Sequence, residues 1–281
     1  MAGVEGRSVV VTGAGGGLGR QHALLLAERG ARVVVNDVGA ALDGTGETRS
    51  PAEDVVEEIR SAGGEAVASY DDVATGAGGQ AIVQAALDAF GRIDGVVNNA
   101  GIIRDRSFHK LSEEEWDAVL RVHLYGAFNV TRAAMPHFRE QEFGRIVVTT
   151  SVTGLYGNFG QANYGAAKLG LVGLINTLAI EGKKVNVLAN AVSPLAVTRM
   201  SAEILDAEFD PAYVSPLVAH LVGEECRSTG EIFHAERGHY ARVRYMISRG
   251  IDFDGVPSVE ALAARWDDLM DMDGAELASL P

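Results

Sequence analysis

The sequence predicts an α/β protein in which one doubly wound parallel sheet carries helices on both faces. Three observations indicate this fold class. Apolar runs rich in Val and Ile, such as residues 8–12, 32–36 and 146–150, lack the polar alternation of a half-exposed strand. Segments with helical periodicity separate these runs along most of the chain. Glycines or polar residues follow the runs, and ligands of such sheets lie beyond the carboxyl ends of the strands.

The first unit of this pattern has a specific order. Strand 8–12 is followed by a glycine turn, a helix that ends near Gly30, and strand 32–36 with Asp37 at its tip. The glycines allow the backbone to approach a pyrophosphate, while the helix N-terminus offers unpaired N–H groups. An acid about 20 residues beyond the glycines can accept hydrogen bonds from a ribose diol. Glycines also form ordinary turns, but this order predicts Rossmann-type dinucleotide binding.

The alternation continues along the chain. A polar loop over residues 43–50 is longer than such units usually need, and Ser112 with Glu115 forms a capping box. We expect further helices over 51–62, 79–90, 112–135 and 163–181, and strands over 66–68, 95–98, 146–150 and 185–191. After Pro194 the pattern weakens, with a helix near 211–223, a strand near residue 232 and a tail helix over 258–270. We predict one domain over residues 1–281, with 199–281 as its substrate side and C-terminal extension.

The composition argues against several classes of protein. A net charge of −14 disfavours general nucleic-acid binding, which needs a basic surface. The single Cys226 cannot form an internal disulfide, so nothing indicates an oxidising compartment. No signal peptide precedes the first strand, and the most apolar stretch, residues 169–180, is far shorter than the ~20 residues that span a bilayer. We expect a cytoplasmic protein with no membrane span and no metal site.

Three residues in the centre of the chain can form a proton-transfer site. Ser151 stands where strand 146–150 ends, and a loop with three glycines follows it. On the next helix, Tyr164 and Lys168 are four residues apart, so both side chains lie on one face. Tyr and Lys often share a helix surface by chance. The catalytic interpretation gains weight because several residues at predicted strand ends should face the same crevice: Gly13, Asp37, Asp72, Asn98, Ser151 and Ser193.

These motifs together resemble the short-chain dehydrogenase/reductase family. The resemblance rests on Thr12-Gly13-x-x-x-Gly17-x-Gly19, Asn98-Asn99-Ala100-Gly101, Ser151 and Tyr164-x-x-x-Lys168, in family order and with family spacing. It is close from about Arg7 to Thr198. The segments 35–37, 101–108 and 156–164 are similar to the (3R)-hydroxyacyl-CoA dehydrogenase part of peroxisomal multifunctional enzyme type 2, also called 17β-hydroxysteroid dehydrogenase type 4. The C-terminal Ser279-Leu280-Pro281 is not a Ser-Lys-Leu peroxisomal address, so we expect a stand-alone relative.

The resemblance implies a role for each matched residue. Tyr164 would be the general base for alcohol oxidation, Ser151 would hydrogen-bond the substrate oxygen, and Lys168 would favour the phenolate and hold the nicotinamide ribose. The Asp37 carboxylate would accept from the adenosine ribose and repel a 2′-phosphate, which predicts NAD over NADP. The other cofactor contacts implied by the match are Gly13, Gly17, Leu18, Gly19, Asp72, Val73, Asn98, Ala100, Gly101, Val197 and Thr198.

Two positions depart from the family pattern. The fourth catalytic position, usually Asn, is His123 within His123-Leu124-Tyr125-Gly126. The hydroxyacyl-CoA branch shares this His, so we interpret it as variation and favour a structural role over proton relay. The usual Pro-Gly after the sixth strand is Pro194-Leu195, which removes freedom at positive φ and leaves the path of this loop open.

The leading hypothesis for function is oxidation of a 3-hydroxyacyl-CoA, with a steroid-linked substrate included. Arginines on the expected crevice side favour a phosphate-bearing carrier: Arg104, Arg106 and Arg199, and more remotely Arg237, Arg242, Arg244 and Arg249. Each of these arginines could instead pair with a surface acid. A free hydroxysteroid dehydrogenase, a 3-oxoacyl-carrier-protein reductase and a non-catalytic dinucleotide sensor are alternatives. The reductases usually use NADPH, for which Asp37 has the wrong charge, and sensors typically lose the Tyr or Lys that this chain keeps.

The helix that carries Tyr164 also predicts assembly. It is apolar almost all round, with Ala166, Ala167, Gly170 and Gly173 among larger aliphatic residues. Such a helix is buried on more than one side, and its small residues permit close approach of another backbone. Burial within one subunit would explain the pattern as well. The family resemblance implies pairing across a two-fold axis, so we expect a homodimer or homotetramer.

Overall fold

The structure is a computed structural model that describes residues 3–46, 50–197 and 206–278. It divides into two compact units, Met1–Ala241 and Arg242–Pro281. An open sheet has the strand order β3-β2-β1-β4-β5-β6-β7-β8, and only the last two residues of β8 fall past the first unit. Its strands are β1 (Ser8–Thr12), β2 (Arg32–Asn36), β3 (Glu65–Ser69), β4 (Gly95–Asn98), β5 (Gly144–Thr149), β6 (Val187–Pro194), β7 (Ile232–Glu236) and β8 (His239–Val243).

The strands from β3 to β7 are all parallel, as the apolar runs predict. Every residue of β1, β4 and β5 is buried, so these strands form the centre of the core. The strand order reverses between β1 and β4, and in a doubly wound sheet the ligand crevice lies outside the carboxyl ends of the strands at this point. The predicted fold class is therefore confirmed.

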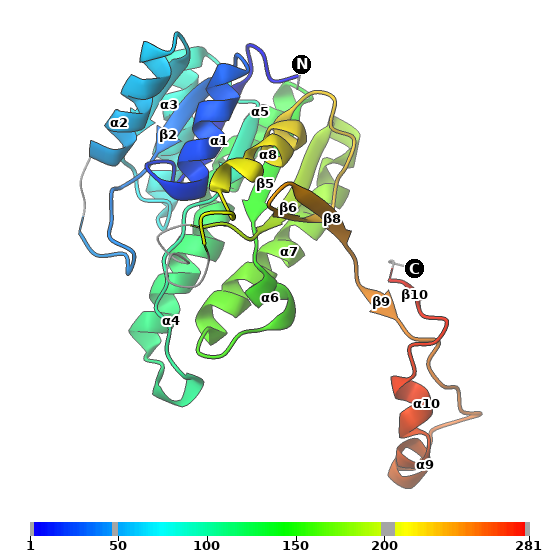
Figure 1. Ribbon diagram of the computed structural model, residues 1–281. Coiled ribbons are helices and arrows are strands. Elements are labelled where there is room, and N and C mark those ends of the chain that lie inside the picture. Colours follow the sequence, from blue (N-terminus) through cyan, green and yellow to red (C-terminus); the bar gives the residue numbers. More distant parts are fainter. Residues whose placement is uncertain (1–2, 47–49, 198–205, 279–281) are drawn as a thin grey trace. The chain divides into compact units, whose positions relative to one another are not determined.

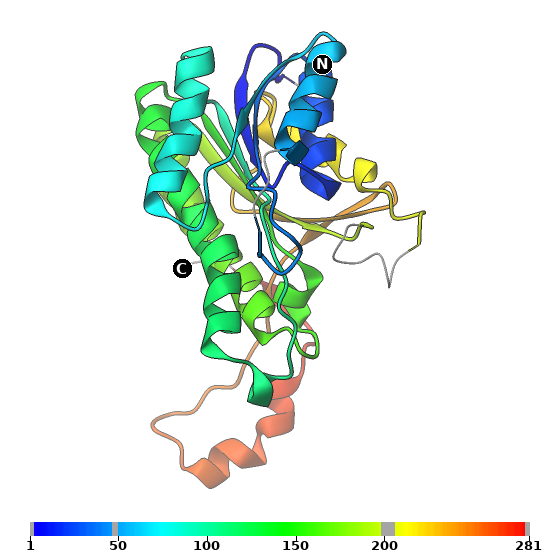
Figure 2. The same cartoon turned by 90° about the vertical axis from the view of Figure 1, so that its left-hand side faces the viewer.

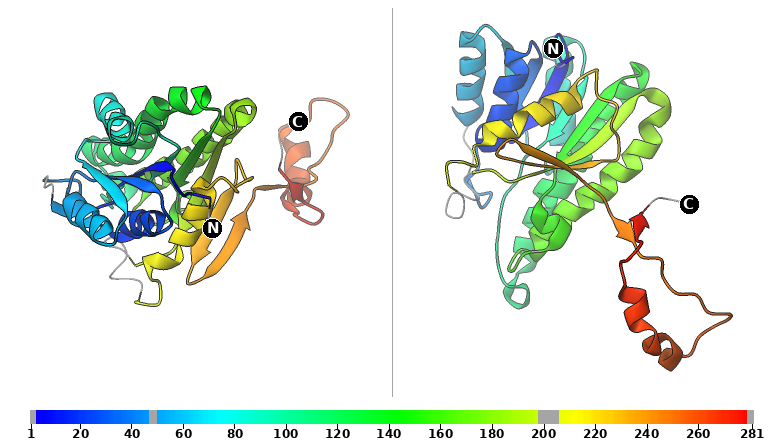
Figure 3. Two further views of the ribbon diagram at one scale, coloured as in Figure 1. Left: turned by 90° about the horizontal axis from the view of Figure 1, so that it is seen from above. Right: turned by 45° about the vertical axis from the view of Figure 1, so that its right-hand side comes forward.

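Two helical layers cover the sheet (Figures 1, 2 and 3). One layer contains α1 (Gly17–Glu28), α2 (Ser50–Ser61) and α8 (Ser215–Val222), and the other contains α3 (Gly76–Phe90), α5 (Gly126–Glu140) and α7 (Ala162–Gly182). Helix α4 (Glu113–Leu120) packs on α7, and the capping box of Ser112 and Glu115 is present at its start. The short helix α6 (Val152–Tyr156) packs on α7 as well.

The structure differs from the sequence prediction in four places. The glycine-rich stretch after Ser151 is not all loop, because α6 occupies its first part. The helix expected over 112–135 is interrupted by a π-helical turn, η2 (Arg121–Tyr125), between α4 and α5. Strand β8 was not predicted, and it follows β7 after the two residues Arg237 and Gly238, both at positive φ. The predicted tail helix over 258–270 is two short helices.

The second unit has little core of its own. It contains a pair of antiparallel strands, β9 (Met246–Ile247) and β10 (Glu276–Leu277), and the helices α9 (Val259–Ala264) and α10 (Trp266–Met270). None of its residues from 242 to 278 is buried. Across the described residues of the whole chain, none of the helices has the length and apolar character needed to cross a membrane.

Candidate active site

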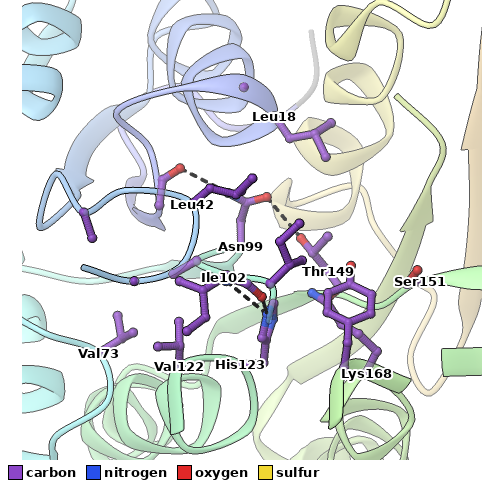
Figure 4. Close-up of a pocket in the computed structure, with 18 of the residues that line it drawn as sticks. Leu18, Leu42, Val73, Asn99, Ile102, Val122, His123, Thr149, Ser151 and Lys168 are labelled. Atoms are coloured by element: carbon purple, nitrogen blue, oxygen red, sulfur yellow. Dashed lines mark hydrogen bonds between the residues drawn. The ribbon is translucent and has the colours of Figure 1, made fainter. Parts of the chain in front are cut away.

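A pocket of about 430 Å³ lies at the carboxyl ends of the parallel strands (Figure 4). In the close-up, Leu18 lies on one side of the pocket and His123 and Lys168 on the opposite side. Eleven of the predicted site residues line it, namely Gly13, Gly17, Leu18, Asp37, Asp72, Val73, Ala100, Gly101, Ser151, Tyr164 and Lys168. Gly19, Asn98, Ser193 and Val197 do not line it, and Thr198 lies outside the described residues. The sequence therefore brings residues from six segments to one cavity, while their roles stay predictions.

Gly13 in the turn after β1 and Gly19 in the first turn of α1 leave no room for a Cβ. Gly13 has φ +62°, and a Cβ there would lie 2.7 Å from the Cα of Ala100. A Cβ on Gly19 would lie 2.2 Å from the carbonyl oxygen of Gly13. Gly13 thus allows the turn to touch the segment after β4, and Gly19 allows α1 to start directly behind the turn although it does not itself face the pocket.

The start of α1 suits an anionic group. Its N-cap is Gly16, which offers no side chain to the first N–H groups, and its first turn contains no acidic residue. Helix N-terminal N–H groups without an internal partner carry a positive potential and bind phosphates well. Gly16, Gly17 and Leu18 all line the pocket. The residues present therefore fit the diphosphate of a dinucleotide.

Thr12 and Asn99 hold this region together, and the sequence analysis did not assign them roles. The Thr12 hydroxyl accepts from the backbone N–H of Asn99 at 3.0 Å and of Ala100 at 3.1 Å. The Asn99 amide donates to the carbonyl oxygens of Thr12 at 3.1 Å and Gly13 at 3.2 Å. Their positions at the ends of adjacent parallel strands could have suggested this contact. The bonds fix the two turns that form the pocket floor.

Asp37 lies at the end of β2, as predicted, and faces the pocket. Its carboxylate accepts from the backbone N–H of Gly15 at 2.8 Å and of Gly39 at 2.7 Å. These bonds hold the carboxylate beside the glycine turn. A carboxylate at this position places a negative charge next to the site where the fold would bind a diphosphate.

The long loop after β2 forms a strap across the pocket. Ala40, Ala41, Leu42, Gly44 and Gly46 line the cavity, and none was predicted. The Leu42 carbonyl accepts from the N–H of Ile103 at 3.2 Å, and the Asp43 carbonyl accepts from Nε of Arg104 at 2.9 Å. The extra length of residues 43–50, noted in the sequence, is the signal that could have indicated such a strap.

Ser151, Tyr164 and Lys168 come together at one end of the pocket. Ser151 caps α6, and its Oγ accepts from the N–H of Thr153 at 3.2 Å. Burial raises the pKa of the Tyr164 phenol, while a hydrogen bond from Ser151 lowers it and the Asp105 charge raises it. The Nζ of Lys168 lies 5.4 Å from the centre of the Tyr164 ring. The phenol therefore needs a nearby positive charge to become a base near neutral pH.

Lys168 is the buried cation of this site. It is only 3% exposed, and its ammonium donates to the carbonyl oxygen of Thr149 at the end of β5. Burial lowers the pKa of Lys168 from 10.5 to about 7, because a charged ammonium loses its hydration inside the protein. Lys168 can thus exchange a proton in the physiological pH range and can stabilise the phenolate of Tyr164 in its charged form.

His123 packs against both the loop after β4 and Tyr164. Its ring lies edge-on to the Tyr164 ring at 5.2 Å, and its Nε2 is 2.8 Å from the carbonyl oxygen of Ile102. A Cβ on Gly101 would lie 2.3 Å from the His123 ring, so Gly101 makes room for it. Burial, followed by the charge of Lys168, lowers the pKa of His123 well below its usual value. His123 is therefore neutral and well placed to support Tyr164.

The arginines considered as anchors for the carrier phosphates differ in their contacts. Arg106 pairs with Glu115 at 2.9 Å, whereas Arg104 contacts the neutral carbonyl oxygen of Asp43. Arg237 lies 3.5 Å from Glu208. Arg242, Arg244 and Arg249 belong to the second unit, and Arg199 lies outside the described residues. In the described ranges there is no group of three or more His, Cys, Asp or Glu side chains that could hold a metal ion.

The chain belongs to the short-chain dehydrogenase family, whose model matches residues 7–208. It is 57% identical over 282 residues to a short-chain type dehydrogenase/reductase of Mycobacterium tuberculosis, covering 99% of each chain. The peroxisomal multifunctional enzyme type 2 of Mus musculus is 50% identical over 278 residues, 96% of this chain and 37% of that protein. The resemblance to that enzyme, predicted from the motifs, is therefore confirmed.

Two further comparisons concern activity and fold. The hydroxyacyl-CoA dehydrogenase ChsB1 of Mycobacterium tuberculosis is 43% identical over 228 residues, which are 76% of this chain and 69% of that protein. A crystal structure of a short chain dehydrogenase from Mycobacterium avium superposes with a TM-score of 0.86 at 43% identity, covering 99% of this chain and 98% of that one. The chain is thus an oxidoreductase of this family.

The burial of Lys168 predicts a pH-dependent cost in stability. Below about pH 7 the folded and unfolded chains both carry the ammonium, so the folded chain bears the full cost of burying it. Between about 7 and 10.5 the unfolded chain binds more protons, so stability rises with pH. Lys168→Met should therefore be more stable than the parent by roughly 3 to 5 kcal/mol at about pH 6, at about 1.4 kcal/mol per pKa unit.

Urea unfolding of the cofactor-free chain measures this difference across pH. The gain from Lys168→Met should shrink steadily as the pH approaches about 10, where both states of the parent become neutral. Lys184→Met, at an exposed position, is the matched control and should show no such trend. A gain from Lys168→Met that does not vary with pH would contradict the buried-charge explanation.

Proposed function

We propose that this protein oxidises the secondary alcohol of a 3-hydroxyacyl-CoA to the 3-oxo compound, with NAD as the hydride acceptor. The observation that carries the proposal is the single pocket shared by the glycine turn, Asp37, Ser151, Tyr164 and Lys168. The first two supply a diphosphate and ribose site, and the last three supply a proton acceptor beside it. The three catalytic candidates come from two segments, because Ser151 follows β5 while Tyr164 and Lys168 both lie on α7.

In the proposed reaction Tyr164 removes the hydroxyl proton while the carbon gives up a hydride. Ser151 hydrogen-bonds the substrate oxygen and orients the carbon. The charged form of Lys168 lowers the pKa of Tyr164, which burial otherwise raises. The bound cofactor supplies the hydride-accepting ring, whose positive charge also favours the phenolate. His123 holds the Tyr164 ring from its edge and stays neutral, so it does not compete with Lys168 for the negative charge.

A coenzyme A thioester is favoured as substrate class by the relatives and by one arginine. A relative of this chain is a hydroxyacyl-CoA dehydrogenase, and the match covers 76% of this chain. Arg104 follows Ile103, which lines the pocket. Its guanidinium donates to the backbone carbonyl of Asp43, whereas the guanidinium of Arg106 pairs with the carboxylate of Glu115. We therefore assign the carrier phosphates to Arg104 first, and not to the Arg104–Arg106 pair.

We further propose a homodimer or homotetramer paired through α7. Leu169 and Ile180 on this helix are 43% and 60% exposed, and a side chain at Gly173 would meet open space. Exposed aliphatic residues around a glycine allow another helix to approach closely. The mass of the protein in solution, measured by light scattering, reports this assembly directly.

The cofactor prediction concerns the charge of Asp37. Asp37→Asn should keep the shape of the side chain and weaken NAD binding, while narrowing the preference for NAD over NADP by about tenfold because repulsion of the 2′-phosphate is lost. Isothermal titration of both cofactors gives the ratio of dissociation constants. Asp88→Asn removes the same charge from an exposed position on α3 that does not line the pocket and should leave that ratio unchanged. Equal affinity of the unmodified protein for NAD and NADP would refute the assignment.

The substrate prediction compares a carrier-linked alcohol with its free counterpart. A 3-hydroxyacyl-CoA should have a much higher kcat/KM than the free 3-hydroxy acid, because the carrier adds binding at Arg104. Arg104→Ala should raise KM by about tenfold and leave kcat largely intact, since the lost binding is shared by ground and transition states. Arg106→Ala is the control and should have a smaller effect, because Glu115 already neutralises that guanidinium. Comparable kcat/KM for a free hydroxysteroid and its CoA-linked counterpart would overturn this substrate class.

A further inference from the structure

A chain of side-chain hydrogen bonds lies beside Ser151 and Tyr164. The Asp105 carboxylate accepts from Nε2 of Gln161 at 2.7 Å. The amide oxygen Oε1 of Gln161 accepts from the Thr153 hydroxyl at 3.0 Å and from Nδ2 of Asn158 at 3.0 Å. Gln161, Thr153 and Asn158 line the pocket, whereas Asp105 does not. An acidic residue outside the cavity is therefore connected to three polar side chains inside it.

The charge of Asp105 determines the orientation of this chain. An ionised carboxylate can only accept hydrogen bonds, so the nitrogen end of the Gln161 amide must face it. The oxygen end must then face Thr153 and Asn158, and both of those groups donate. The amide nitrogen has two hydrogens and Asp105 takes one, which leaves the second for another acceptor. Asp105 holds the nitrogen end of the Gln161 amide, and Asn158, whose Oδ1 accepts from the N–H of Phe159 at 3.0 Å, holds its oxygen end.

The loop after β4, which carries Asp105, is hydrogen-bonded through its backbone to the start of α7. The N–H of Arg106 donates to the carbonyl oxygen of Gly160 at 2.8 Å, and Nδ2 of Asn163 donates to the carbonyl oxygen of Arg104 at 3.0 Å. Asn163 also caps the N–H of Tyr164 at 2.8 Å. Asp105 thus lies between two fixed backbone contacts, so its carboxylate is held facing Gln161.

We infer that Asp105 is a positioning residue of this active site, which fixes the Gln161 amide so that its free N–H serves a carbonyl oxygen of the substrate. The inference rests on the proposed function, since a thioester carbonyl two carbons from the reacting alcohol is the acceptor that a 3-hydroxyacyl-CoA would supply. Asp105 itself touches neither substrate nor cofactor. It acts through Gln161, and its negative charge makes this hydrogen bond stronger than one between two neutral groups.

Asp105 also contributes to the electrostatics of Tyr164. The titratable groups around the phenol are Lys168 on the same helix, neutral His123 on η2, and Asp105 on the loop after β4. Burial raises the pKa of Tyr164 most, and the negative charge of Asp105 raises it further. Removing that charge should lower the pKa of Tyr164. The acid limb of the pH–rate profile for alcohol oxidation should then move to lower pH, because the phenolate forms at lower pH.

The test compares Asp105→Asn with Asp105→Glu. Asn keeps the shape of Asp but has no charge and can donate as well as accept, so it no longer requires the nitrogen end of the Gln161 amide to face it. Glu changes the length but stays an acceptor with a negative charge. Asp105→Asn should raise KM for the hydroxyacyl-CoA by about three- to tenfold, with a smaller change in kcat, and Asp105→Glu should restore most of the loss. In a Gln161→Ala background, Asp105→Asn should cause no further rise in KM.

The chain offers a matched control. Asp88 on α3 accepts from Nε2 of Gln84 at 2.7 Å, which is the same kind of bond at the same length in a region that does not line the pocket. Asp88→Asn should leave KM and the pH profile unchanged. If Asp105 only packed in its loop, Asn would be tolerated and Glu would be harmful, and this reversed order would overturn the inference.

A second readout does not depend on the substrate. Phenolate absorbance can be titrated in each variant and in its Tyr164→Phe counterpart, and the difference reports Tyr164 alone. Asp105→Asn should lower the pKa of Tyr164 relative to the parent, while Asp105→Glu and Asp88→Asn should not. A parent that binds NAD but oxidises no hydroxyacyl-CoA would contradict the proposed function and leave this titration valid. An unchanged Tyr164 titration in Asp105→Asn would contradict the electrostatic contribution of Asp105, whereas an unchanged KM would contradict its positioning role.

Discussion

The side chain of Asn99 joins the ends of three neighbouring strands, and the site depends on this junction. Asn99 follows β4, its amide nitrogen donates to the backbone after β1, and its amide oxygen accepts from the hydroxyl of Thr149 at the end of β5 at 3.4 Å (Figure 4). Parallel strands leave their carboxyl ends at one edge, where backbone groups have lost their ladder partners. Asn99 satisfies several of these groups and so links the dinucleotide half of the pocket to the catalytic half.

The catalytic half depends on one buried charge. The Thr149 hydroxyl donates to Asn99, and the Thr149 carbonyl oxygen accepts from the Lys168 ammonium. Burial favours the neutral forms of both Lys168 and Tyr164, so it lowers the pKa of Lys168 to about 7 and raises the pKa of Tyr164. Lys168 can therefore exchange a proton near neutral pH, whereas an exposed lysine would stay charged, and its charged form favours the phenolate of Tyr164. The unfavourable burial of Lys168 is therefore part of the chemistry.

The sequence predicted the fold and much of the site because local patterns encode them. The β-branched runs became the buried parallel strands, and the capping box at Ser112 is present. Helix α6 was missed because three glycines indicated a loop, yet Gly154 is small for another reason: a Cβ there would lie 2.8 Å from the Cβ of Lys168. The contacts of Asn99 with Thr12, and of Gln161 with Asp105, join residues 87 and 56 positions apart. No pattern within one segment signals such pairs, and only the expected adjacency of the strand ends could have suggested the first.

The central claim is that Tyr164 acts as the proton acceptor beside a bound nicotinamide. Tyr164→Phe tests it most directly, because the change removes only the phenol oxygen and leaves the ring that packs against His123. We measure NAD affinity by calorimetry and alcohol oxidation by the appearance of NADH in the same preparation. The account predicts NAD binding close to that of the parent, with kcat lower by a factor of about 10² to 10⁴. Turnover that survives the loss of the phenol would contradict it.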